Sequence, residues 1–151
     1  MKIIEGDLIG LALEGEFDLI VHGCNCFCTM GAGIAKTIKD VFPEAYKADL
    51  NTKKGSKEKL GKISTAEVQS GENRIIVVNG YTQFYPSGDG VLVDYEAVSS
   101  VFYTIKQQFP GTRIGYPMIG AGLARGDWSI ISSLINDRLS GENHTFVKYK
   151  E

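Results

Sequence analysis

Several features are missing from this sequence of 151 residues, and each absence excludes a class of protein. No apolar run is long enough to cross a bilayer, which excludes a helical membrane protein. Positive and negative charges nearly cancel, with a net charge of −2, so no overall field draws the chain onto nucleic acid. The first residues, MKIIEGDL, reach acidic side chains too early for a secretion signal. We therefore expect a cytoplasmic protein with reduced cysteines and no membrane partner.

The sequence also lacks a complete metal-binding pattern. Cys24, Cys26 and Cys28 occupy alternate positions, whereas structural zinc sites usually space their ligands as Cys-x-x-Cys and draw a second pair from elsewhere. His22 and the distant His144 are the remaining soft ligands. We therefore expect no metal and no cofactor, and we expect the thiols to pack beneath a loop. The alternative is a catalytic cysteine, which would need a nearby base and a lowered pKa.

What is present is an alternation of strand and helix patterns, without a repeat or a linker. Apolar runs predict strands at residues 2–4, 19–23, 62–68, 74–78, 113–116 and 145–149. Helical spacing predicts helices at residues 33–42, 44–50, 95–109 and 128–139, with Asp94 as a cap. In the first helix one face carries Ile34, Ile38, Val41 and Phe42, and Pro43 ends the run. The core stripe of the third helix is Val98, Val101, Phe102, Ile105 and Phe109, and SGEN between the third and fourth strands predicts a hairpin. We therefore expect one α/β domain, a three-layer α/β/α sandwich around a mixed, mostly parallel sheet. In such sheets, ligands bind beyond the carboxyl ends of the strands.

Two glycine-rich segments share the same context, since each follows a predicted strand and leads into a helix. They are Gly31-Ala32-Gly33 and Gly120-Ala121-Gly122. Glycine lets the backbone approach a ligand closely, and the free N–H groups at a helix N-terminus suit phosphate. The first segment lacks the third glycine of a dinucleotide fingerprint, and the chain contains no Gly-Lys-Ser/Thr P-loop motif. The pair predicts a diphosphate held by backbone from both sides; the alternative is two tight turns.

These segments, together with EGDL near the N-terminus, resemble the macro domain family, whose members bind ADP-ribose. The resemblance covers almost all of residues 1–151, in the family's order, and implies a single macro domain. EGDL resembles the motif whose acid holds the adenine amino group. IVHGCNCFCTMGAGIA resembles the segment with an asparagine near the distal ribose and a loop under the diphosphate, and PMIGAGLARGDW resembles the second phosphate loop. The implied ADP-ribose-binding residues are Asp7, Leu8, Asn25, Gly31, Ala32, Gly33, Ile34, Ile119, Gly120, Ala121, Gly122 and Leu123.

Within that family, His-x-Cys-Asn followed by Gly-x-Gly-Ile-Ala is most similar to one branch. This branch contains ADP-ribose 1″-phosphate phosphatases and terminal ADP-ribose glycohydrolases. Its glycohydrolases use a lysine and an aspartate at positions that align with Gly80 and Ala124 here, so a lysine adduct has no obvious residue to form on. The resemblance therefore favours release of phosphate from ADP-ribose 1″-phosphate. The alternatives are a non-catalytic ADP-ribose-binding module and a glycohydrolase acting on ADP-ribosylated protein or nucleic acid.

Two side chains are candidates for proton transfer. His22 ends a predicted central strand, where a histidine can act as general acid or base near pH 7; the alternative is a core histidine bonded to a backbone carbonyl. Asp127 follows the second glycine segment and could activate water, or it could cap the helix that starts at Trp128. Residues 81–83 follow the predicted fourth strand and could line the distal ribose or phosphate; the alternative is a surface turn. Tyr149 could flank the adenine or belong to the core.

The one local excess of charge is a run of lysines between the helices and the predicted hairpin: Lys53, Lys54, Lys57, Lys59 and Lys62. The expected role of this run is a solvated loop. The alternative is a patch that follows the phosphates of an ADP-ribosylated nucleic acid, in which case binding would depend strongly on salt.

Overall fold

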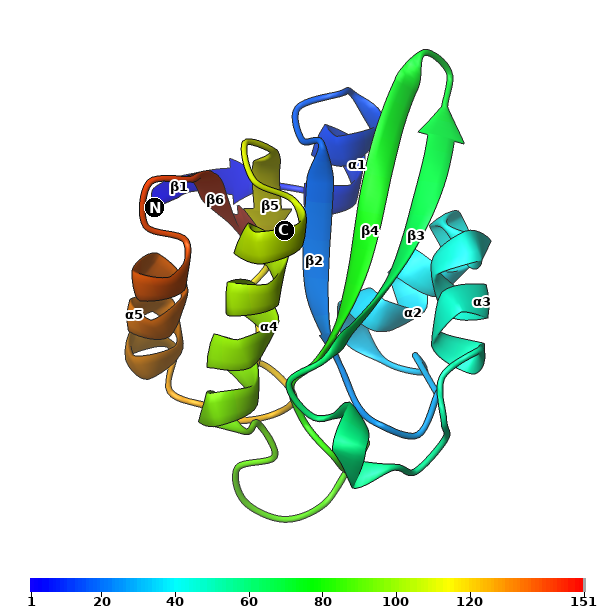
Figure 1. Cartoon of the computed structure of the whole chain (residues 1–151), viewed down its shortest axis with the longest axis vertical. Helices are drawn as coiled ribbons and strands as arrows, with labels where there is room; N and C mark the ends of the chain where they lie inside the picture. Colours follow the sequence, from blue (N-terminus) through cyan, green and yellow to red (C-terminus); the bar gives the residue numbers. More distant parts are fainter. Residues whose placement is uncertain (151) are drawn as a thin grey trace.

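A six-stranded sheet forms the centre of the molecule, which a computed structural model describes for residues 1–150 (Figure 1). The strands are β1 (Lys2–Gly6), β2 (Leu19–Cys24), β3 (Ile63–Ser70), β4 (Asn73–Tyr81), β5 (Arg113–Tyr116) and β6 (Asn143–Tyr149). Their order is β1-β6-β5-β2-β4-β3. The β3–β4 hairpin is antiparallel and the other neighbouring pairs are parallel. The predicted mixed, mostly parallel sheet is therefore confirmed.

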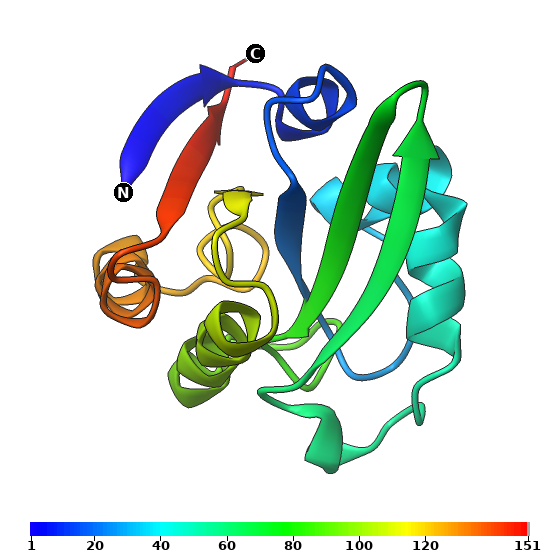
Figure 2. The same cartoon turned by 45° about the horizontal axis from the view of Figure 1, so that its top comes forward.

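Helices cover both faces of this sheet and complete the predicted three-layer sandwich (Figure 2). One face carries α1 (Leu8–Leu13), α2 (Gly33–Val41) and α3 (Pro43–Leu50), and the other carries α4 (Tyr95–Gln108) and α5 (Trp128–Arg138). A short 3-10 turn, η1 (Lys57–Lys59), precedes β3. Within residues 1–150, none of these helices has both the length and the apolar character that a membrane span requires.

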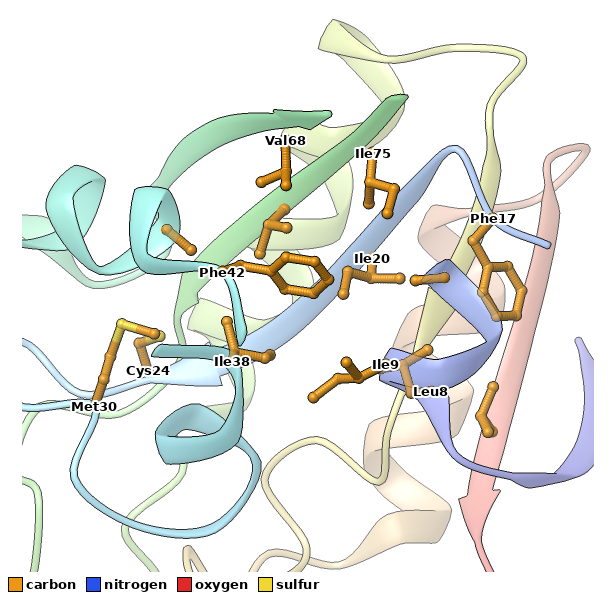
Figure 3. Packing of buried hydrophobic residues seen from close by; sticks show 14 of the residues in the cluster. Leu8, Ile9, Phe17, Ile20, Cys24, Met30, Ile38, Phe42, Val68 and Ile75 are labelled. Carbon is orange, nitrogen blue, oxygen red and sulfur yellow. The ribbon is translucent and has the colours of Figure 1, made fainter. Parts of the chain in front are cut away.

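Each face has its own buried core. Ile9, Ile38 and Phe42 fill the space between the sheet and α1–α3, and Cys24 and Met30 lie at one end of that cluster (Figure 3). The second cluster lies under α4 and α5 and contains the predicted stripe of Val98, Val101, Phe102 and Ile105. The two cores fix the sheet between the helix layers, so the loops at its carboxyl edge start from rigid positions.

Aspartates begin several helices because a carboxylate can accept from the free N–H groups of the first turn. Asp94 Oδ1 accepts from Ala97 N at 3.0 Å, which confirms the predicted cap of α4. Asp127 Oδ1 accepts in the same way from Ser129 N at 2.9 Å at the start of α5. Asp7 caps α1. These three acidic side chains therefore have a structural role as helix caps in the free protein.

Most differences between prediction and structure concern short elements and edges. The helix α1 was not predicted, because six residues, LIGLAL, are too few for a helical period to show. Pro43 ends α2 as predicted, but it also begins α3, since proline suits the first helical position. Val41 was predicted on the buried face of α2 and is 41% exposed. The core alternative for Tyr149 is wrong, because this side chain is 72% exposed on β6 near the end of the chain.

Candidate functional site

A pocket of about 430 Å³ opens at the carboxyl ends of β2 and β5. Its volume lies within the range of small-molecule sites. The wall comes from the loops after β2, β4 and β5, the first turn of α2 and one residue of α3. The residues that line it are Gly23, Cys24, Asn25, Thr29, Met30, Gly31, Ala32, Gly33, Ile34, Ala35, Asp49, Gln83, Pro86, Pro117, Met118, Ile119, Gly120, Gly122, Leu123 and Ala124.

The two glycine segments meet across this pocket. Leu123 Cδ1 lies 3.4 Å from the position that a Cβ atom would take on Gly33. Gly33 and Gly120 have positive φ angles of 59° and 73°, which residues with side chains rarely adopt. A Cβ on Gly120 would also lie 2.6 Å from Val93 Cγ2. The backbone therefore favours glycine at both positions, and the structure brings together the two loops that the sequence paired.

Nine of the twelve predicted binding residues line the pocket; the other three do not. Asp7 is exposed and caps α1, where its Oδ1 accepts from Ile9 N at 3.3 Å. Leu8 is buried in the first core, and Ala121 packs against the second core. The predicted adenine-binding pair therefore stands apart from the wall that the glycine loops form.

Asn25 lines the pocket, but its side chain is already bonded within its own loop. Its Oδ1 accepts from Phe27 N at 2.8 Å, and its Nδ2 donates to Thr29 Oγ1 at 2.7 Å. These two bonds shape the turn that leads to Gly31. In the free protein, Asn25 therefore orders the first glycine loop as well as forming part of the wall.

His22 lies in the core and does not line the pocket. It is 0% exposed, and its Nε2 donates to Asn79 Oδ1 at 2.7 Å. The direction follows from Asn79, whose Nδ2 donates to Ala45 O and Ser64 Oγ. Burial lowers the pKa of His22 to about 4, against the opposing effect of the Asn79 hydrogen bond. His22 is therefore a neutral core histidine near pH 7, bonded to an amide side chain and not to a backbone carbonyl.

Asp127, the second predicted catalytic side chain, is exposed outside the pocket wall. Hydrogen bonds from the Ser129 side chain and backbone lower the pKa of its carboxyl group. Trp128, the next residue, packs on β6 with its ring centroid 4.6 Å from that of Phe146. The structure thus does not bring His22 and Asp127 together at the pocket. Of residues 81–83, Gln83 lines the pocket, while Tyr81 and Thr82 are buried.

The sequence prediction missed a buried polar group beside the pocket. Asp49 of α3 lines the wall although it is only 1% exposed, and its Oδ1 accepts from the Tyr81 hydroxyl at 2.7 Å. Burial raises the pKa of Asp49, while the Tyr81 hydrogen bond and the charge of Lys59 act in the opposite direction. A signal existed in the sequence, because Asp49 stands four residues after the buried Ala45, on the same face of α3.

Lys59 is the exception within the lysine run. Its side chain is 7% exposed, whereas Lys53, Lys54, Lys57 and Lys62 are exposed as a solvated loop requires. The ammonium group of Lys59 donates to Cys26 O at 3.2 Å and to Cys28 Sγ at 3.5 Å. It therefore ties η1 to the loop after β2.

The three cysteines, in β2 and in the loop that follows it, are free and their side chains are buried. Burial raises the pKa of the Cys24 and Cys26 thiols, which disfavours the nucleophilic thiolate. Among residues 1–150, no group of three His, Cys, Asp or Glu side chains lies close enough together to hold a metal ion.

Gly80 and Ala124, which replace side chains of the related glycohydrolases, have different surroundings. A Cβ on Gly80 would lie 2.7 Å from Val101 Cγ1, so a lysine does not fit there unless Val101 shifts. Ala124 lines the pocket as a small apolar side chain. Neither position can supply a nucleophile or an acid.

No sequence model of a known protein family matches the chain. An uncharacterized 17.5 kDa protein from the tk-vs intergenic region of Enterobacteria phage T4 is 36% identical over 141 residues, covering 90% of this chain and 88% of the phage protein.

Solved structures show the same fold. The macrodomain of Thermus aquaticus DarG superposes with a TM-score of 0.74 at 20% identity, over 99% of this chain and 97% of that one. Thermosipho africanus DarTG in complex with ADP-ribose matches with a TM-score of 0.75 at 18% identity, over 97% of this chain and 40% of the DarTG chain.

Proposed function

Because the chain belongs to the macro domain family, we propose that it binds ADP-ribose in the pocket between its glycine loops. Its phage T4 relative belongs to the same family. One observation carries the proposal: Gly31, Gly33, Gly120 and Gly122 stand in a single pocket wall, on two loops that touch across it. This arrangement offers backbone N–H groups to a diphosphate from two sides.

The start of α2 suits the negative charge of such a diphosphate. Its N-cap residue, Ala32, has no side chain that could bond the first free N–H groups. These groups, with the positive end of the helix dipole, are available to phosphate oxygens. Ile34, Ile119 and Leu123 add apolar surface on both sides of the pocket. Within the described chain, the pocket wall contains no lysine or arginine, so backbone groups would meet the charge of the diphosphate.

The proposal retains the adenine contact of Asp7. The cap bond of Asp7 uses Oδ1, and the other carboxylate oxygen can accept from the exocyclic amino group of adenine. Asp7→Ala is expected to weaken ADP-ribose binding by about 1–3 kcal/mol, the scale for a hydrogen bond to a charged group. A folded Asp7→Ala protein with unchanged affinity in calorimetry would remove Asp7 from the site.

We also propose that the protein hydrolyses a bond at the distal ribose, and two reactions are candidates. The first is release of phosphate from ADP-ribose 1″-phosphate, with His22 moving a proton. Because His22 lies behind the wall, this version requires either rearrangement around Asn79 or attack by water without a histidine. The second version is cleavage of the bond between ADP-ribose and modified protein or nucleic acid.

Isothermal titration of the protein with ADP-ribose tests the proposed binding directly. One molecule per chain is expected to bind, more tightly than ADP, because the distal ribose adds contacts. Absence of binding would overturn the proposal. Incubation with ADP-ribose 1″-phosphate and with ADP-ribosylated protein and DNA then separates the two reactions. Released phosphate supports the first version, free ADP-ribose supports the second, and no product from any of them leaves a binding module.

A further inference from the structure

Asp49 is the one charged residue among the described residues that line the pocket. It projects from α3, and burial removes all but 1% of its surface from solvent. Its second carboxylate oxygen, Oδ2, has no hydrogen-bond partner within residues 1–150. A buried carboxylate oxygen without a donor is costly, so a donor brought by a ligand would be stabilised there.

A hydrogen bond from Tyr81, whose hydroxyl is in turn bonded to Ser64, fixes the position of this carboxylate. The Tyr81 hydroxyl donates to Asp49 Oδ1 at 2.7 Å, and the Ser64 hydroxyl lies 2.8 Å from the same Tyr81 oxygen. Burial raises the pKa of Tyr81, so the phenol keeps its proton and remains a donor. Asp49 therefore has one oxygen held in place by the protein and one left over.

No cation of the described chain forms a salt bridge with Asp49. The ion pairs that the structure contains are Lys36–Asp40, Arg74–Glu67 and Arg113–Asp18, all at exposed sites. The charge of Lys59 acts to lower the pKa of Asp49, but its ammonium group donates to Cys26 O and Cys28 Sγ and not to the carboxylate. Asp49 Oδ2 thus lies in the pocket wall as a buried oxygen with neither a hydrogen-bond donor nor a salt bridge.

The sheet order indicates which end of a ligand would reach this charge. Asp7 follows β1 at one edge of the sheet, the glycine loops follow the central strands β2 and β5, and α3 packs on β3 and β4 at the other edge. With adenine at Asp7 and the diphosphate between the loops, as in the proposed function, the distal ribose would extend toward Asp49.

We propose that Asp49 sets the specificity of the pocket for the group at the distal ribose. Its carboxylate accepts a hydrogen bond from a neutral or positively charged donor, such as a ribose hydroxyl or a nitrogen-linked substituent, and repels a terminal phosphate. Repulsion of this kind is an effective way to reject a competing ligand, because like charges are poorly screened away from water. This inference rests on the proposed ADP-ribose binding and assigns the substrate class to ADP-ribosyl compounds whose distal end carries no phosphate.

Affinities of three ligands for the full chain test this assignment: ADP, ADP-ribose and ADP-ribose 1″-phosphate. The wild-type protein is expected to prefer ADP-ribose to its 1″-phosphate by about 10-fold or more, given the usual cost of placing like charges together. Asp49→Asn keeps an oxygen for the Tyr81 hydrogen bond and removes the charge. It is expected to bind the 1″-phosphate more tightly than wild type does, with unchanged affinity for ADP.

Asp40→Asn is the matched control, since Asp40 is an exposed acid of α2 outside the pocket wall. It should leave all three affinities unchanged. If the role of Asp49 were only structural, Asp49→Asn would lower the affinity for all three ligands together. That result would overturn the proposed specificity role. If Asp49→Asn does not fold, the affinities of the wild-type protein for ADP-ribose and for its 1″-phosphate decide the question. Equal or tighter binding of the 1″-phosphate would overturn the inference. Failure of ADP-ribose itself to bind would instead overturn the proposed function.

Discussion

At the scale of single residues, burial changes what His22 and Asp49 can do. Both side chains are almost completely inaccessible to solvent, and in each case burial disfavours the charged form. His22 has an amide partner in the core, lies behind Cys24 with its Nε2 3.5 Å from Cys24 Sγ, and does not itself line the pocket, so it stabilises the strand end as a neutral group. Asp49 has one oxygen without a partner and lines the pocket, which makes it available to a ligand.

The pH dependence of stability should reveal the buried state of His22. The pKa of His22 is about 4 in the folded protein against 6.5 normally. A lowered folded pKa means that its contribution is complete above pH 6.5 and is lost as the pH falls toward 4. This difference in pKa corresponds to a contribution of roughly 3 kcal/mol to the free energy of unfolding. His22→Gln keeps a donor for Asn79 but does not titrate.

Urea unfolding of wild type and His22→Gln between pH 7.5 and pH 4 measures this contribution. The free energy of unfolding of the wild type should fall more steeply, by up to roughly 3 kcal/mol relative to His22→Gln. Carboxyl groups that titrate in the same window are common to both proteins and cancel in the difference. Parallel curves would mean that His22 is accessible to solvent, and its catalytic role would regain support.

Asp127 provides a second prediction at this scale. Because its carboxylate caps α5, Asp127→Ala should lower the free energy of unfolding, as loss of a side-chain cap does. ADP-ribose affinity should not change, since Asp127 does not line the pocket. Denaturation and calorimetry on the same preparation measure both quantities. Loss of hydrolytic activity in a variant that keeps its stability would restore Asp127 as the residue that activates water.

At the scale of secondary structure, the junction between β2 and α2 carries most of the proposed site. The hydrogen bonds of Asn25 order the loop, and Gly33 starts the helix in a conformation that other residues rarely adopt. The second loop contributes Leu123 against the same point. A ligand between these loops would meet a helix N-terminus on one side and apolar side chains on the other.

Gly33→Val should separate backbone strain from ligand contact when it is compared with Gly71→Val. Both glycines have nearly equal positive φ angles, 59° and 58°, but Gly71 belongs to the β3–β4 turn and Gly33 lines the pocket. Each substitution should destabilise the fold by about 1–3 kcal/mol through strain. Only Gly33→Val should abolish ADP-ribose binding in calorimetry. Normal binding by Gly33→Val would make this loop a simple turn.

At the scale of the whole molecule, the site depends on strands that are distant in sequence. The loops after β2 and β5 are neighbours because these strands pair in the sheet, and Asp49 reaches the same pocket because α3 packs on the adjacent β4 and β3. A ligand that bridges these parts binds only the folded chain. Its binding free energy therefore adds to the stability of the whole fold.

Calorimetric unfolding in the presence of ADP-ribose should show this coupling. With free ligand at about 100 times its dissociation constant, the folded state gains about 2.7 kcal/mol. For a chain of this size, that gain should raise the melting temperature by about 5–10 °C. ADP at the same multiple of its own dissociation constant is the control and should give an equal shift. An unchanged melting temperature at saturating ADP-ribose would contradict specific binding to the native state.

The sequence by itself determined the layers, most of the strands and the two glycine loops. Strand and helix periods depend on which side chains face a core, and that pattern is local, as in Arg113–Tyr116 and in the stripe of α4. Glycine at positions 33 and 120 is likewise a local requirement of the backbone. The sequence could also pair the two loops, because carboxyl ends of parallel strands share one edge of a sheet.

Only the tertiary structure decided which titratable side chains face the pocket. His22 and Asp127 were plausible catalysts by their places along the chain, but the direction of a side chain at a strand end and the use of an acid as a cap depend on packing. Lys59 was expected in a solvated loop, but the fold buries it, and it buries Asp49 beside the pocket. The helical spacing of Ala45 and Asp49 indicates a shared face, but the partners of both charged side chains come from distant segments, so the local pattern could not assign those partners.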